Sequence, residues 1–365
     1  MLADIFLLAV SFLIIILGAE LFTNGVEWLG VRLRLSEGAV GSVLAAVGTA
    51  LPETLIPIVA LIFFREASSH EIGLGAILGA PFMLATLGFC VTATAAVAYR
   101  RRRTAGIRLA LDRQVVSRDL GFFLPPYALA IAVSFAPVGH WVRWLVAACL
   151  LATYALYLYL NLSESAESEK KEPLTFNLVW AYVPLVRRDT DAHARRRNHI
   201  DGQPPRIRAV TGQIAVALGL IIGGAYQFVE ATRTLTELIG VSPLVFSLIV
   251  APIATELPEK FNSVIWVRQG RDTLSMGNIS GAMVFQSTFP VMVGMLLTPW
   301  HFQSLAAGGA ALLSAGIALV SAAIVLAWIR FGKSETVAPW PLLAGLLWWL
   351  IFLGYVLSVG IGRPV

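Results

Sequence analysis

Thr49-Ala50-Leu51-Pro52-Glu53 and Thr255-Glu256-Leu257-Pro258-Glu259 are two copies of one phrase, 206 residues apart, and they decide the fold of this chain. Each copy lies inside a long apolar run, so each places a carboxylate and a helix-breaking proline within a hydrophobic segment. The same offset relates Gly18 to Gly224, Ala19 to Ala225, Phe22 to Phe228 and Ser36 to Ser242. The sequence therefore contains an internal duplication.

The composition is that of an integral membrane protein. Hydrophobic residues make up 57% of the 365 residues, only 13% are charged, and the mean hydropathy is +0.76. The first apolar run starts almost at the N-terminus without a basic region or a small-residue cleavage site, so we expect a retained span and no signal peptide. Cys90 and Cys149 are both in apolar stretches and the five histidines are scattered, which predicts neither disulfides nor a thiolate or histidine metal site.

About ten apolar runs are long enough to cross a bilayer as helices, which takes roughly 20 residues each. They cover residues 3–29, 38–64, 71–98, 120–137, 141–161, 209–230, 241–267, 274–298, 306–329 and 338–360. The pattern predicts an all-α polytopic membrane protein with two halves of five helices, 1–161 and 209–365. The polar segment 162–208 between them is expected to be a flexible linker that contains one short interfacial helix.

The basic residues predict the orientation in the membrane. With the N-terminus outside, the cytoplasmic connections hold most of the Lys and Arg, including the run Arg100-Arg101-Arg102-Arg103 and the 162–208 segment. We therefore expect a protein of the cell (inner) membrane with both termini outside and the linker in the cytoplasm. Because five spans per half is an odd number, the second half is inverted relative to the first. The net charge of +5 is accounted for by orientation and needs no nucleic-acid partner.

The repeated phrase has the chemistry of a cation site. A proline inside a helix removes one backbone hydrogen bond, so we expect helix breaks at Pro52 and Pro258 that free carbonyl oxygens to face a ligand. Glu53 and Glu259 add two carboxylates to this set of oxygens. A doubly anionic, all-oxygen site suits a dehydrated calcium ion or sodium ions. The structural alternative is that each acid is simply paired, Glu259 with Lys260 for example.

The two phrases, with the preceding Gly48 and Ala254, resemble the two alpha repeats of the sodium/calcium exchanger family of the calcium/cation antiporter superfamily. The resemblance covers both membrane halves and implies ten helices in two inverted five-helix repeats. It also implies that Glu53 and Glu259 ligate calcium, and that Thr49 and Thr255 contribute to the calcium and sodium sites. No cofactor is implied, and the expected partners are small inorganic cations and the lipid bilayer.

The chain departs from the family pattern at several ligand positions. Ala50 and Glu256 follow the threonines, where family members usually have serine. In the glycine-rich helices Ala80 and Ala282 replace serines, and the polar ligand positions fall at Leu84 and Gln286. Several oxygen ligands for sodium are therefore absent, while Gln286 keeps a neutral one.

Glu256 adds a third membrane carboxylate, three residues before Glu259. A carboxylate near another can carry a proton, which makes Glu256 a candidate proton or sodium site. The equally weighted alternative is a salt bridge to Lys260, four positions later.

Two classes of function follow. The first is a secondary antiporter that exchanges calcium against sodium, or a cation against protons with Glu256 as the carrier. The second is a passive cation pathway or a non-transporting homologue on the same scaffold. An enzyme is the least expected class, because the sequence offers no nucleophile with a base, phosphate loop or metal-histidine cluster.

Overall fold

The computed structural model describes residues 1–32, 45–64, 66–135, 138–165, 207–302, 305, 307–332, 334 and 336–359. Within these ranges the regular elements are helices, and the isolated bridge between Leu109 and Val337 is the only β-type pairing. The longer helices are α1 (Leu2–Arg32), α2 (Ala45–Ile62), α3 (Ala67–Met83), α4 (Phe89–Ala98), α5 (Arg113–Val133), α6 (His140–Ser165), α8 (Ile207–Ile239), α9 (Pro243–Thr255), α10 (Leu257–Arg268), α11 (Asp272–Leu297), α12 (Gly308–Phe331) and α13 (Trp340–Ser358). The predicted linker and its interfacial helix are almost entirely outside the described residues.

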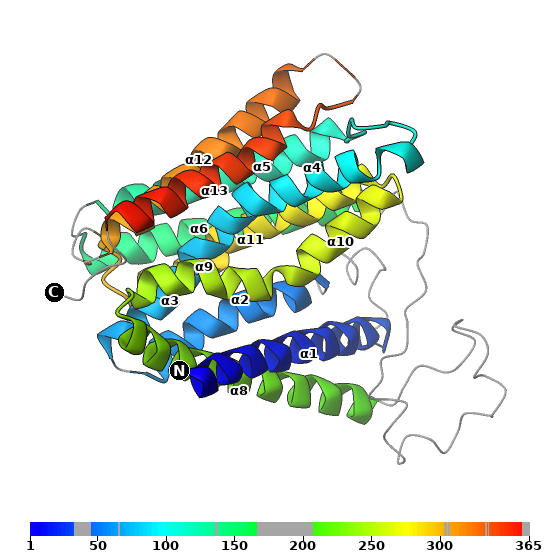
Figure 1. Cartoon of the computed structure of the whole chain (residues 1–365). Coiled ribbons are helices and arrows are strands. Elements are labelled where there is room, and N and C mark those ends of the chain that lie inside the picture. Colours follow the sequence, from blue (N-terminus) through cyan, green and yellow to red (C-terminus); the bar gives the residue numbers. More distant parts are fainter. Residues whose placement is uncertain are drawn as a thin grey trace.

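The described helices account for ten passes through the membrane. Among the described residues, eight segments are long and apolar enough to span it. The other two passes are α2 and the consecutive pair α9 and α10. The start of α1 and the end of α13 lie on the same side of the bundle (Figure 1), as an even number of passes requires. The all-α, ten-helix prediction is confirmed.

Helix α5 begins earlier than the sequence predicted. The expected run started at residue 120, whereas α5 starts at Arg113. The reason is an N-cap that hydropathy does not reveal: a carboxylate oxygen of Asp112 accepts hydrogen bonds from the backbone amides of Gln114, at 2.9 Å, and Val115, at 3.4 Å. Asp119 therefore lies within the helix rather than before it.

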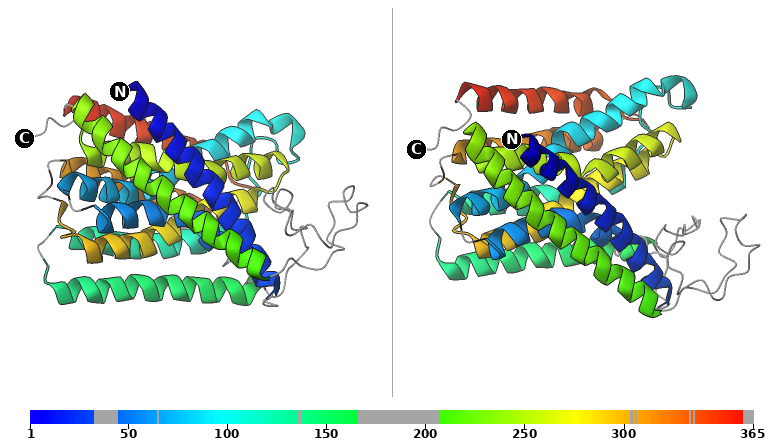
Figure 2. Two further views of the ribbon diagram at one scale, coloured as in Figure 1. Left: turned by 90° about the horizontal axis from the view of Figure 1, so that it is seen from below. Right: turned by 60° about the horizontal axis from the view of Figure 1, so that its bottom comes forward.

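The first helices of the two halves pack against each other in a symmetric way. A Cβ atom on Gly18 would lie 2.8 Å from the Ile221 side chain and 3.2 Å from the carbonyl oxygen of Ala217. A Cβ atom on Gly224 would lie 2.8 Å from the Ile15 side chain and 3.2 Å from the carbonyl oxygen of Ser11. The second set of contacts is the first shifted by the 206-residue repeat. It follows that α1 and α8 are antiparallel, and Figure 2 shows them side by side, crossing the other helices diagonally. The inverted repeats are confirmed.

Close backbone packing also joins the third helix of the first half to the second half. A Cβ atom on Gly75 would lie 2.3 Å from the carbonyl oxygen of Leu244, and one on Gly79 only 2.2 Å from that of Leu248. The Ser247 hydroxyl donates a 2.7 Å hydrogen bond to the carbonyl of Ile72 in the same contact. The glycines of α3 thus allow α9, which leads into the second Pro-Glu phrase, to approach closely.

The third helix of the first half is interrupted by a π-helical turn. Residues Leu84–Gly88 form this turn between α3 and α4, and the Ser321 hydroxyl donates a 2.6 Å hydrogen bond to the carbonyl of Ala85. Helix α11, the corresponding element in the second half, is assigned as α-helix throughout. The two repeats therefore differ at Leu84, one of the two expected ligand positions.

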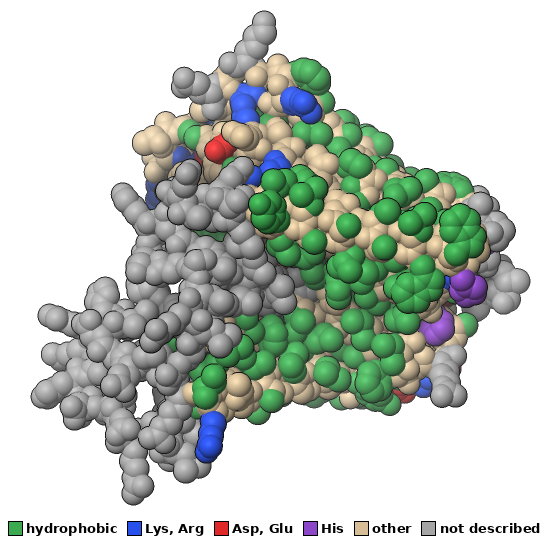
Figure 3. Space-filling model, turned by 180° about the vertical axis from the view of Figure 1, so that it is seen from behind, with side chains coloured by type: hydrophobic (Ala, Val, Ile, Leu, Met, Phe, Trp, Pro, Cys, Tyr) green, Lys and Arg blue, Asp and Glu red, His purple; other side chains and the backbone are tan. Residues whose placement is uncertain are grey.

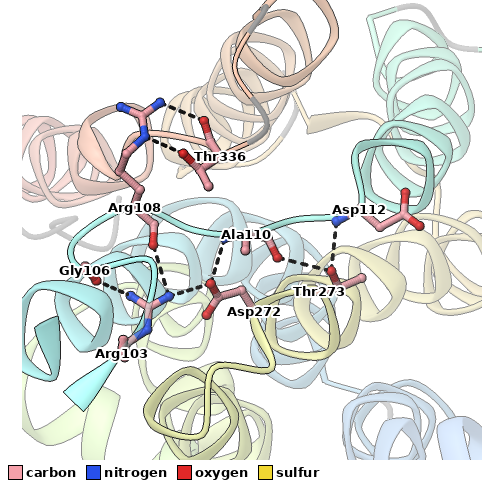
Figure 4. A network of polar contacts seen from close by, with 8 residues as sticks. All are labelled: Arg103, Gly106, Arg108, Ala110, Asp112, Asp272, Thr273 and Thr336. Carbon is pink, nitrogen blue, oxygen red and sulfur yellow. Dashed lines mark hydrogen bonds and ion pairs between the residues drawn. The ribbon is translucent and has the colours of Figure 1, made fainter.

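The connection between α4 and α5 is attached to the start of α11 by a buried ion pair (Figure 4). Arg103 donates to a carboxylate oxygen of Asp272 at 2.5 Å, and the backbone amide of Ala110 donates to the same oxygen at 2.8 Å. Both charged side chains are 1% exposed. Arg103 also donates to the carbonyls of Gly106 and Arg108. This network fixes the N-terminal end of α11.

The outer surface suits a lipid environment. Hydrophobic side chains are spread over the described part of the face in Figure 3, and most of the visible Lys and Arg side chains lie toward one end. Exposed apolar residues include Trp141 and Trp144 of α6 and Phe331 at the end of α12. Such a large exposed apolar area is expected where lipid rather than water is the neighbour.

Candidate cation site

The second Pro-Glu phrase breaks its helix as predicted. Helix α9 ends at Thr255 and α10 begins at Leu257, with Glu256 between them at φ −94° and ψ 6°. Pro258 falls in the first turn of α10, where its missing amide hydrogen costs nothing. The carboxyl end of α9, where helix carbonyls carry partial negative charge, thus lies beside Glu256.

The first phrase behaves differently. The predicted break at Pro52 is wrong, because α2 runs as one helix from Ala45 to Ile62 with Pro52 and Pro57 inside it. Neighbouring helices accommodate such prolines in a packed bundle. Pro52 still has no amide hydrogen to donate, so one carbonyl of the preceding turn lacks its usual helical partner.

Glu53 and Glu259 are buried with oxygens that accept no hydrogen bond. Each residue is 5% exposed. Among the described residues, both carboxylate oxygens of Glu53 and Oε2 of Glu259 are buried without a hydrogen-bond partner. The two carboxylates are close enough for their charges to interact. Unsatisfied anionic oxygens are costly in a membrane interior, so this pair is a candidate cation site.

Glu256 and Gln286 extend the same polar region. Glu256 is fully buried, and one of its oxygens lies 2.9 Å from the ammonium of Lys260. Its charge also interacts with those of Glu53 and Glu259, and the Gln286 side chain of α11 lies beside it. The Gln286 amide oxygen has no hydrogen-bond donor among the described residues.

The structure places only one of the two candidate threonines. Thr255 is buried at the end of α9, where its hydroxyl donates a 3.2 Å hydrogen bond to the carbonyl of Ala251. Its oxygen keeps lone pairs for a cation. The side chain of Thr49 lies outside the described residues. Leu84, at the other expected ligand position, is a fully buried apolar side chain.

The charges of this region leave an excess of two negative units. In formal charge, three carboxylates meet one ammonium, and the ion pair of Lys260 is with Glu256 rather than with Glu53 or Glu259. Within the described residues, no three acidic, histidine or cysteine side chains are close enough together to hold a metal ion by themselves. A cation here would therefore use carbonyl, hydroxyl and amide oxygens in addition to the two carboxylates, as hard cations do.

Sequence reasoning missed one residue of the site. Asn278 of α11 donates a 3.1 Å hydrogen bond to the backbone carbonyl of Glu259 and so connects α11 to the first turn of α10. The available signal was a polar side chain inside the apolar run 274–298, three positions before Gly281.

Comparison with known proteins agrees with this geometry. The family model described as sodium/calcium exchanger protein matches residues 4–163 and 209–358, which is most of the chain. The chain belongs to this family of cation exchangers. The resemblance inferred from the repeated phrases is confirmed, and the membership makes the protein a transporter by family.

Two curated relatives show the range of similarity. "Putative antiporter CaxA" from Alkalimonas amylolytica is 23% identical over 354 residues, which are 97% of this chain and 97% of the relative. "Inner membrane protein YrbG" from Escherichia coli (strain K12) is 28% identical over 93 residues, 26% of this chain and 29% of the relative.

Solved exchanger structures share the fold. The H+/Ca2+ exchanger CAX is 17% identical with a TM-score of 0.66, covering 98% of this chain and 87% of its own. The sodium-calcium exchanger NCX_Mj is 15% identical with a TM-score of 0.55, covering 97% of this chain and 98% of its own. At these identities the likeness establishes the arrangement of helices and nothing about the ions.

Proposed function

We propose that this cation exchanger carries calcium through Glu53 and Glu259 in exchange for sodium. The observation that supports this most is the pair of buried carboxylates with unpartnered oxygens, one from each inverted repeat. The net excess of two negative charges equals the charge of one calcium ion. Carboxylate, carbonyl, hydroxyl and amide oxygens are the ligands that calcium prefers.

The inverted repeats supply the means of alternating access. Because each half contributes one acid to the site, movement of one half against the other can expose the same two carboxylates first to one side and then to the other. Sodium ions would occupy the site when calcium leaves, with Thr255 and Thr49 as further oxygen ligands. The orientation predicted from the basic residues, with both termini outside, belongs to this proposal.

The test is calcium uptake into proteoliposomes that contain the purified protein. We expect radioactive calcium to accumulate when an outward sodium gradient is imposed and to stay at background levels without a gradient. Imposing a proton gradient in a parallel sample tests the coupling ion separately. Absence of gradient-driven flux for every cation tried would overturn the exchange proposal and favour a passive or non-transporting homologue.

A second candidate is cation exchange against protons with Glu256 as the carrier. The supporting observation is that Glu256 is a fully buried third carboxylate, located between the two half-helices. Ala50 and Leu84 also remove expected sodium ligands. Glu256→Gln separates the candidates: a proton carrier would lose the pH dependence of uptake, whereas a mere partner of Lys260 would keep the wild-type pH profile at reduced stability.

A further inference from the structure

Asp119 is a buried acid outside the cation site, among α5, α6 and α11. Asp119 of α5 is 2% exposed. One of its carboxylate oxygens accepts a 3.0 Å hydrogen bond from the Tyr157 hydroxyl of α6, and the other lies 2.6 Å from the Ser280 hydroxyl of α11. Gly281 follows Ser280, and a Cβ atom there would lie 3.2 Å from the Tyr157 oxygen, so the glycine makes room for this contact.

The Ser280 hydroxyl has two acceptors for its one proton. Besides the 2.6 Å contact to Asp119, it lies 2.9 Å from the carbonyl oxygen of Met276. When Asp119 is charged, Ser280 donates to the carboxylate. When Asp119 is protonated, the acid can donate to Ser280, whose own proton then turns to Met276. Both states keep a hydrogen bond between Asp119 and Ser280, but protonation reverses its donor and removes the negative charge beside α11.

We propose that Asp119 is a proton-binding site separate from the cation site, with Ser280 as the hydroxyl that exchanges its hydrogen-bond partner when the proton arrives. Asp119 lies about 9 Å along the helix axis from the start of α5, at 1.5 Å per residue. Arg118, the preceding residue, lines a cavity of about 460 Å³ between α5 and α6.

The site communicates with the cation site through one helix. Ser280 and Gln286 are both on α11, about 9 Å apart along its axis. Protonation changes the bond that attaches α11 to α5, and α11 also holds Glu259 through Asn278. This gives an exchanger a way to make cation affinity depend on protons without placing the proton on a cation ligand.

The charged and titratable groups around Asp119 are few. Arg118 on its own helix interacts with its charge, and α6 contributes Tyr157 and Tyr154. Helix α11 has Asp272 only at its first residue, where it is paired with Arg103. Helix α12, which also packs on α5, has no titratable side chain before Arg330.

Asp119→Asn is a close mimic of the protonated state. Its amide can donate to Ser280 while its carbonyl accepts from Tyr157, so both contacts to neighbouring helices remain and only proton exchange is lost. Glu53→Gln is the matched control, because it removes one buried carboxyl from the cation site and leaves Asp119 intact.

The experiment is difference infrared spectroscopy of the purified full-length protein between about pH 5 and pH 9, a range that covers the values of many buried carboxyls. We expect a protonated-carboxyl band in the wild type that is absent from Asp119→Asn and present in Glu53→Gln. Tyr157→Phe should shift the frequency of this band, since it removes a hydrogen bond to the same carboxyl. The Tyr157→Phe variant therefore tests the proposal even if Asp119→Asn fails to fold.

The transport assay adds a second readout, which rests on the proposed function whereas the spectra do not. Calcium uptake by Asp119→Asn should be less dependent on pH than that of the wild type. Identical carboxyl bands in wild type and Asp119→Asn, a band unmoved by Tyr157→Phe, or an unchanged pH profile of uptake in folded Asp119→Asn would overturn the proposal. If the wild type carries no calcium, exchange fails as a function while the spectra still decide whether Asp119 binds a proton.

Discussion

The ammonium of Lys260 lies 2.9 Å from a carboxylate oxygen of Glu256, one helical turn away across the break between α9 and α10. Glu256 is fully buried and the Lys260 side chain is 12% exposed. The direct ion pair of Lys260 is with one of three buried carboxylates and does not include Glu53 or Glu259. Lys260 therefore sets the net charge of the proposed cation site at two negative units.

Replacing one partner of the Glu256–Lys260 pair should destabilise the protein more than replacing both. Glu256→Gln leaves a partly buried ammonium and Lys260→Gln leaves a buried carboxylate, so we expect each to lower the free energy of unfolding by about 3 kcal/mol. The double variant removes both charges and should recover most of the loss. Thermal unfolding of the wild type, the two single variants and the double variant in detergent measures this double-mutant cycle. If the losses of stability in the single variants simply add up in the double variant, the two side chains do not interact.

The close contact between α1 and α8 predicts how alanine substitutions of three glycines change the stability of the protein. Gly18→Ala and Gly224→Ala place a methyl group 2.8 Å from an isoleucine carbon of the facing helix, so we expect losses of about 1–3 kcal/mol in each case. Gly223→Ala is the control, because a Cβ atom there meets nothing within 4 Å. It should be neutral or slightly stabilising. Equal melting temperatures for all three variants would contradict the packing.

The buried ion pair at the start of α11 is expected to be structural. Asp272→Asn removes the charge that faces Arg103 in a site where both side chains are 1% exposed, so the free energy of unfolding should fall by about 3 kcal/mol. Arg101→Gln alters an exposed residue of the same arginine run and should change stability by less than about 0.5 kcal/mol. Similar unfolding midpoints for the two variants would contradict this role.

The repeated phrases predicted most of the fold because they combine two strong constraints. Long apolar runs identify spans, and a fixed offset between Gly18 and Gly224 identifies an inverted pair once each half has five spans. Both signals are local in sequence and depend little on packing. The break at Glu256 was also predicted, from Pro258.

Features that depend on tertiary contacts were not predictable in this way. Helix α2 stays continuous at Pro52 although the same motif breaks its partner, so the surroundings and not the proline decide the outcome. Asp119 was missed because the hydropathy of its helix rises only at Leu120, whereas the Asp112 cap starts the helix at Arg113. Asn278 makes a contact with Glu259 that no pattern in the sequence specifies.

Calcium binding to the purified protein tests the central claim most directly. Isothermal titration should give one calcium ion per chain for the wild type, with affinity reduced at least about 100-fold, near 2.7 kcal/mol, in Glu53→Gln and in Glu259→Gln. Glu237→Gln, which alters an exposed acid of α8, should bind as the wild type does. Wild-type affinity in folded Glu53→Gln and Glu259→Gln would show that the two buried carboxylates do not form the cation site.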